Sequence, residues 1–132
     1  MEPLLSFATE ILILLFLIIV FLQSGIDKVY DWKGNLSWLK QHFADTPLKG
    51  LVPFLLATLS LTEMAAGILC AVGLYEITIM GDSTIALYGG IVSCAALLML
   101  LFGQRLAKDY EGAKTIAVYF VPAIFLVYLL TR

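Results

Sequence analysis

The stretch FLQSGIDKVYDWKGN, from Phe21 to Asn35, decides the fold because a long apolar run ends inside it. The run before it is unbroken from Ile11 to Leu22, and with its flanking residues it reaches the roughly 20 residues that a helix needs to cross a bilayer. Asp27 and Lys28 then open a charged segment that a hydrocarbon core would not accept. The stretch therefore marks a membrane boundary.

Polar residues in this stretch fall on two neighbouring faces of the expected helix. Gln23, Asp27 and Asp31 are spaced i, i+4, i+8 and line one face, while Ser24 and Lys28 line the next. Two interpretations stay open. The residues are either a solvated helix end or a polar cluster that faces into a helix bundle at the membrane edge.

The composition is that of an integral membrane protein with the lipid bilayer as its surroundings. Of 132 residues, 61% are hydrophobic and 14% are charged, and the mean hydropathy is +0.98. A net charge of −2 gives no basis for binding nucleic acid. The only histidine, His42, lies between Lys40 and Asp45, where we expect a solvated surface residue. We therefore expect no metal site and no haem ligand set.

These patterns predict an all-α membrane protein, a four-transmembrane-helix bundle that forms a single domain over residues 1–132. The expected helices cover about 4–28, 51–74, 84–102 and 113–130. A short amphipathic helix at about 35–45, with Asn35 as its N-cap, should lie at the membrane interface in the first loop. Trp32 and Trp38 are its expected interface anchors.

Glu63 is the most unusual residue because it lies inside an apolar helix. A carboxylate in the bilayer costs at least about 2.5 kcal/mol, so we expect Glu63 to face protein. Gly67 and Cys70 continue its face, and Gly89 and Gly90 mark a similar face of small residues on the third helix. Such faces let helices approach closely, so these four residues are the predicted packing positions.

Depth along the helices predicts the partner of Glu63. Measured from the helix ends at the first and third loops, Glu63 lies about 18 Å deep and Ser93 about 15 Å. Ser93 is therefore the best-matched partner. Gln23 lies only about 6 Å deep and Asp27 at the edge. A proton path from Asp27 through Gln23 to Glu63 would therefore have a gap. A Glu63 that only fixes helix packing would look the same in sequence.

Positive charge is concentrated on one side of the expected bundle. Seven basic residues fall in loops one and three or at their edges, namely Lys28, Lys33, Lys40, Lys49, Arg105, Lys108 and Lys114, and only Arg132 falls on the other side. The positive-inside rule then predicts cytoplasmic loops one and three and periplasmic termini in a bacterial inner membrane.

The first half of the chain resembles the DoxX family of four-helix membrane proteins. The matching motifs are Gly25, Asp27 and Lys28 at the end of the first helix, Pro47 or Pro53 before the second, and Glu63 with Gly67 inside the second. Some members are subunits of quinone-linked membrane redox complexes. The resemblance implies partners that are other integral membrane subunits, with quinone as the candidate cofactor and no cofactor bound by motifs of this chain.

The sequence is compatible with three functions. The sequence favours an accessory or structural subunit of a larger membrane complex, possessing no catalytic activity of its own. The alternatives are a small proton-coupled transporter, in which Glu63 binds a proton or cation, and a quinone-linked oxidoreductase, in which Glu63 or Asp27 accepts protons.

Overall fold

The computed structural model describes residues 5–47 and 49–131, which are helical apart from short turns. Four helices are long and apolar enough to cross a membrane, which confirms the prediction of an all-α chain with four such helices. They are α2 (Ala8–Tyr30), α4 (Val52–Met80), α5 (Thr84–Leu106) and α6 (Tyr110–Leu130). The first connection contains the short helix α3 (Trp32–His42) and a single 3-10 turn, η1 (Lys49–Leu51).

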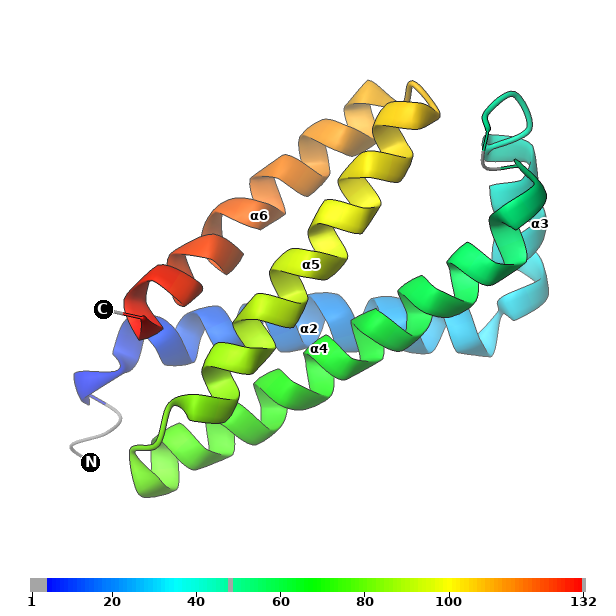
Figure 1. Ribbon diagram of the computed structural model, residues 1–132. Helices are drawn as coiled ribbons and strands as arrows, with labels where there is room; N and C mark the ends of the chain where they lie inside the picture. The colour runs from blue at the N-terminus through cyan, green and yellow to red at the C-terminus, as the bar shows by residue number, and fades with distance from the viewer. Residues whose placement is uncertain (1–4, 48, 132) are drawn as a thin grey trace.

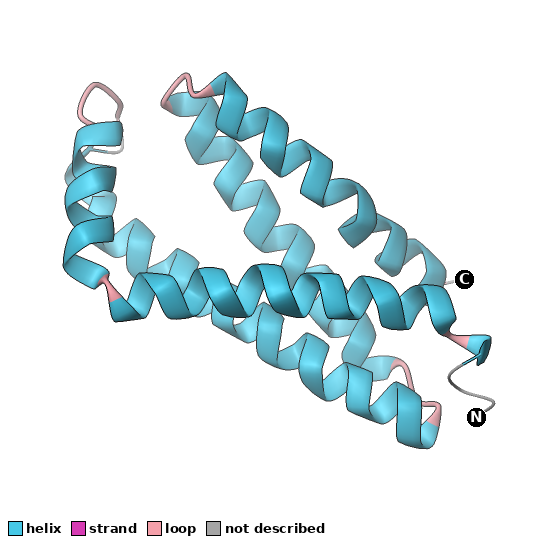
Figure 2. Cartoon of the chain, turned by 180° about the vertical axis from the view of Figure 1, so that it is seen from behind, coloured by secondary structure: helices cyan, strands magenta, loops and turns pink. Residues whose placement is uncertain are grey.

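Helices α4 and α5 form the centre of the bundle, and α2 and α6 pack against them. Helix α4 contacts α2 on one side and α5 on the other, and α6 packs mainly against α5 (Figures 1 and 2). The buried core draws on all four, with Leu17, Ala66, Leu97 and Leu126 among its members. Large apolar side chains also cover the outside of the helices. An apolar outer surface is what lipid-facing helices require, so the fold suits a bilayer.

Small residues bring α4 and α5 into close contact. A Cβ on Gly89 would lie 2.9 Å from the backbone nitrogen of Cys70, so these two predicted packing positions meet each other. About one turn further along both helices, a Cβ on Gly73 would lie 2.5 Å from Cα of Ala86. The sequence interpretation did not single out Gly73 and Ala86. Backbones this close leave no room for a side chain between them.

The other two predicted glycines pack against different helices. Gly67 faces Leu22 of α2, and Gly90 faces Leu126 and Val127 of α6. The small residues therefore do not form one shared face. They allow close packing in three separate helix pairs, which are α2–α4, α4–α5 and α5–α6.

The helices differ from the prediction mainly at their ends. Helix α4 runs to Met80 and not to residue 74, because backbone hydrogen bonding continues until Gly81 adopts a left-handed φ of 71°. Its N–H then bonds to the carbonyl of Ile77, as in other glycine-terminated helices. The predicted start of the first helix at residue 4 lies outside the described residues.

The interfacial helix is joined to α2 by a sharp bend at Asp31 (Figure 1). Asn35 is not its N-cap, because α3 already begins at Trp32. The Asn35 side chain instead donates to the carbonyl oxygens of Asp31 at 2.9 Å and Asp27 at 3.3 Å. Each carbonyl also accepts a backbone N–H, Asp27 from Asp31 and Asp31 from Asn35, so the side chain adds a second bond to both. Asn35 thus stabilises the bend between the two helices.

Replacing Gly73 by Ala should destabilise the α4–α5 contact, because the new methyl group would meet backbone atoms that cannot move aside. Overpacking of this kind costs about 1–3 kcal/mol. The control is Gly50→Ala, since a Cβ there has no atom within 4 Å. Chemical unfolding of both variants in detergent micelles tests this, and equal stabilities would contradict the close contact.

Candidate functional site

A buried polar cluster joins α2 to α4 through Ser24, Lys28 and Glu63. The Ser24 hydroxyl donates to Oε2 of Glu63 at 2.7 Å, and Lys28 Nζ donates to Ser24 Oγ at 2.7 Å. Lys28 Nζ also lies 2.9 Å from Oε1 of Glu63. Ser24 and Lys28 are four residues apart on α2, so both side chains reach the same carboxylate. We call these three residues the α2–α4 ion-pair cluster.

Burial strengthens the attraction between Lys28 and Glu63 and makes the loss of either charge costly. Only 2% of the Glu63 side chain is exposed, against 16% of the Lys28 side chain. No hydrogen bond within the described residues reaches Oε1, so the contact of that atom with Lys28 is one of charge alone. Opposite charges attract strongly where water is excluded, and a buried charge without a partner is costly. The cluster is therefore neutral as a whole and depends on both ionised members.

Ser93 is not the partner of Glu63, so that prediction was wrong. Its hydroxyl donates to the backbone carbonyl of Gly89 at 2.7 Å and lies 3.7 Å from Cys70 Sγ. A serine within a helix often satisfies itself on the preceding turn. Ser93 therefore belongs to the α4–α5 contact, while Glu63 turns toward α2.

Glu63 lies beside α2 at a level that helix lengths alone did not predict, because α2 and α4 do not end at the same level. Gly25 packs against Met64, so Glu63 lies level with the last turns of α2. The first turns of α4 extend beyond α2 and contact α3 instead. Ser24 lies six residues before the end of α2, which places the carboxylate about 9 Å from that end and not about 18 Å. The cluster therefore lies near the end of α2 that leads into α3.

Gln23 and Asp27 lie on the exposed side of α2, and the hydrogen bond and the ion pair of Glu63 come from Ser24 and Lys28 instead. Gln23 and Asp27 line an open cavity of about 530 Å³ together with Ser24, Lys28 and Tyr119. Glu63 also contributes to its wall. The connection to Glu63 therefore runs through Ser24 and Lys28 on the neighbouring face of the helix, and the proposed path through Gln23 is not formed.

Ser60 is a second buried polar residue on this side of α4. It is 4% exposed and precedes Glu63 by three residues, on the same face of the helix. Its hydroxyl has no hydrogen-bond partner within the described residues. The sequence analysis placed Ser24 beside Lys28 in a candidate polar cluster, but it did not single out Ser60, since serine in an apolar helix is an ordinary packing residue.

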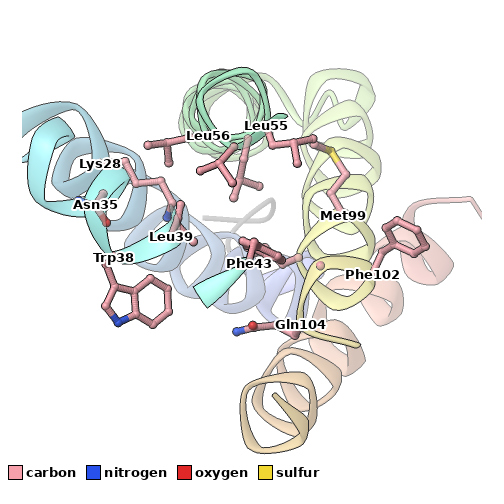
Figure 3. A pocket seen from close by; sticks show the side chains of 14 residues that line it. Lys28, Asn35, Trp38, Leu39, Phe43, Leu55, Leu56, Met99, Phe102 and Gln104 are labelled. Carbon is pink, nitrogen blue, oxygen red and sulfur yellow. The ribbon is translucent and has the colours of Figure 1, made fainter. Parts of the chain in front are cut away.

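A second cavity, of about 370 Å³, lies between α3, α4 and α5 (Figure 3). Figure 3 shows Leu55 and Leu56 of α4 on one side and Met99 and Phe102 of α5 on the other. Polar side chains are few in its lining, and they are Lys28, Asn35, Trp38 and Gln104. Lys28 and Leu100 line both cavities, so the two cavities are neighbours and Lys28 borders each of them.

The end of α3 is attached to the α5–α6 turn through His42, which the prediction had placed in solvent. Its Nε2 lies 3.0 Å from Oε1 of Gln104 and 3.7 Å from Oδ2 of Asp109. Trp38 stacks on the imidazole with the ring centroids 4.5 Å apart. The sequence offers no signal for this contact, because Gln104 is 62 positions away. Trp32, the other expected anchor, is half-buried at the start of α3.

The described residues contain no group of three or more His, Cys, Asp or Glu side chains that could hold a metal ion. Cys70 and Cys94 are both buried and free. Comparisons of the chain with protein-family models, curated proteins and solved structures found no match. The chemistry that the site offers is that of its own side chains, a partly buried ammonium and a buried carboxylate linked by one hydroxyl.

Replacing Lys28 by Met should destabilise the fold by about 3–5 kcal/mol, because Glu63 is then a buried charge without a partner. Glu63→Leu should cost less, since the partly exposed Lys28 ammonium can turn toward water. The double variant Lys28→Met with Glu63→Leu should recover most of the loss, because it buries no charge. Chemical unfolding in detergent micelles gives the three values. Additive losses in the double variant would contradict the pairing.

Replacing His42 by Ala should release the end of α3 from α5, at a cost of about 1 kcal/mol for the lost hydrogen bond. Backbone amides of α3 should then exchange hydrogen for deuterium faster, while those of α4 and α5 keep their rates. Lys40→Ala is the matched control, because Lys40 is exposed on the same helix. Equal exchange in both variants would show that His42 does not hold α3.

Proposed function

We propose that the chain is a DoxX-like integral membrane protein that serves as an accessory or structural subunit of a larger, quinone-linked membrane complex. The observation that supports this best is the α2–α4 ion-pair cluster, in which the membrane carboxylate already has its cation within the same chain. Glu63 then acts as a packing residue that fixes two helices. A subunit needs such a stable frame more than it needs a reactive carboxylate.

The same observation weighs against a carrier. A carboxylate that carries protons or cations must exchange its partner during each cycle, and it must reach water from both sides of the membrane in turn. Glu63 is 1% exposed and has a lysine at 2.9 Å. Releasing it from Lys28 would leave a buried charge, so the ground state resists that step.

A proton-coupled carrier is kept as the second candidate because of one feature. The open cavity lined by Gln23, Asp27 and Tyr119 leads to the ion-pair cluster, and water in it would give the Lys28–Glu63 pair a route to one side. Ser24 accepts from Lys28 and donates to Glu63, so it could pass a proton between them.

The orientation in the proposal follows the distribution of positive charge. Helix α3 and the α5–α6 turn lie at the same end of the bundle (Figure 1), and His42 joins them. The basic residues of loops one and three therefore gather at one end, which we assign to the cytoplasm. Both termini would then face the periplasm of a bacterial inner membrane. Partner subunits would contact the outer faces of the helices, and any quinone would be shared with them.

The experiment is purification of the tagged chain from its native membrane in a mild detergent, with mass spectrometry of the proteins that accompany it. We expect stoichiometric recovery of other integral membrane subunits. The Lys28→Met, Glu63→Leu double variant should recover them equally well, because it keeps the helices packed without charge. Recovery of the chain alone would contradict the subunit proposal.

The carrier is tested separately in proteoliposomes, with a pH-sensitive dye inside and an imposed potential. Proton uptake that is present in the wild type and absent in the double variant would favour the carrier. No flux in either protein, together with recovered partners, is the result that the subunit proposal expects.

A further inference from the structure

We propose that the cavity between α3, α4 and α5 binds one acyl glycerolipid, and that Lys28 donates a hydrogen bond to an ester carbonyl of this lipid. The inference goes beyond the proposed function, since a subunit and a carrier could each hold such a lipid. It rests on the lining of the cavity, on the free donor of Lys28, on the neutrality of the ion-pair cluster and on the position of the site along the helices.

The walls of the cavity suit a hydrocarbon chain. Leu39 comes from α3 and Phe43 from the residue after it, Leu56 from α4 and Met99 from α5, and most of the lining is apolar (Figure 3). The volume of about 370 Å³ falls within the range of about 300–1,000 Å³ in which small-molecule sites lie. Gly103 also lines the cavity, and a Cβ there would point at the Phe43 ring, 3.4 Å away.

Lys28 supplies a hydrogen-bond donor to this apolar space. An ammonium has three N–H donors, and within the described residues Nζ donates to Ser24 and contacts Glu63. At least one N–H is therefore left over. Because Lys28 lines the cavity, an acceptor on a bound molecule can take this donor. Only 16% of the Lys28 side chain is exposed, so little of its donor capacity is met by solvent and a ligand that provides an acceptor is favoured.

The charge of the cluster selects the kind of acceptor. Glu63 already neutralises Lys28 at 2.9 Å, so a carboxylate or phosphate placed on the same ammonium would leave one net negative charge in an apolar site. An ester carbonyl accepts the hydrogen bond without adding charge. Neutral acceptors are therefore preferred over anionic ones, although Lys28 is a cation.

The position of the cavity matches the layer of lipid ester groups. Lys28 lies in the last turn of α2, a helix about 35 Å long, which slightly exceeds the hydrocarbon thickness of about 30 Å. Its ammonium is thus close to the boundary between tails and head groups. Trp38 lines the same cavity and is 56% exposed, as an indole at the membrane interface commonly is. A lipid with its tail in the cavity would place its ester carbonyls beside Lys28.

Quenching of Trp38 fluorescence by brominated lipids tests the proposal. The chain has two tryptophans, so Trp32→Phe leaves Trp38 as the only one. The purified variant in detergent is titrated with dibrominated phosphatidylcholine, with the dibrominated free fatty acid and with a dibrominated alkane of equal length. We expect saturable quenching by phosphatidylcholine at one site, and about tenfold weaker binding of the alkane, because it lacks the acceptor for a charged donor.

Two variants locate the site. Gly103→Leu should abolish saturable quenching, since the side chain fills the cavity and leucine suits a helix better than glycine. Ala65→Leu is its matched control, because Ala65 is exposed on α4 outside the cavity lining, and it should bind like the parent. The Lys28→Met, Glu63→Leu double variant should bind phosphatidylcholine about tenfold more weakly, close to the alkane.

Several results would overturn the proposal. Quenching that persists in Gly103→Leu would mean that lipids meet Trp38 only from the surrounding micelle. Tighter binding of the free fatty acid than of phosphatidylcholine would show a site for anions. Displacement of phosphatidylcholine by a short-tailed benzoquinone at a lower concentration than that of the lipid would show a site for redox lipids. Equal binding of the alkane and phosphatidylcholine would show that Lys28 contributes nothing to lipid binding.

Discussion

The contact between Lys28 and Glu63 is the constraint on which the rest of the structure depends. An ionised Glu63 alone would be unacceptable at its position, because an unpaired buried charge is costly. Lys28, Ser24 and Glu63 together form a neutral unit that fixes how α2 lies along α4. A shift of one helical turn between the helices would separate the charges, so the pair sets the register more sharply than apolar packing does.

That register determines the geometry at one end of the bundle. Because α4 extends beyond the end of α2, its first turns need a different neighbour, and α3 provides it after the bend at Asp31. Helix α3 then reaches across to α5, where His42 contacts Gln104. The cavity between α3, α4 and α5 follows from this arrangement. The apolar space lies directly beside the buried charges for the same reason.

The two cavities give the ion-pair cluster different surroundings on its two sides. The one that contains Gln23 and Asp27 is open and partly polar, whereas the one beside α3 is mostly apolar. Lys28 borders both, so its ammonium is positioned between polar groups and a space suited to lipid. A packing role for the cluster and a lipid beside it are compatible, because the free N–H of Lys28 is not needed for holding Glu63.

The sequence by itself determined the helices and the need of Glu63 for a partner. Long apolar runs predict helices of the right number because backbone hydrogen bonding and burial are local properties of each run. The cost of a carboxylate in an apolar helix likewise depends only on that helix. The sequence did not select Lys28 over Ser93, nor did it place His42 on Gln104. Those contacts depend on the relative level of α2 and α4 and on the bend at Asp31, which only packing between helices decides, because no local pattern records how far one helix extends past another.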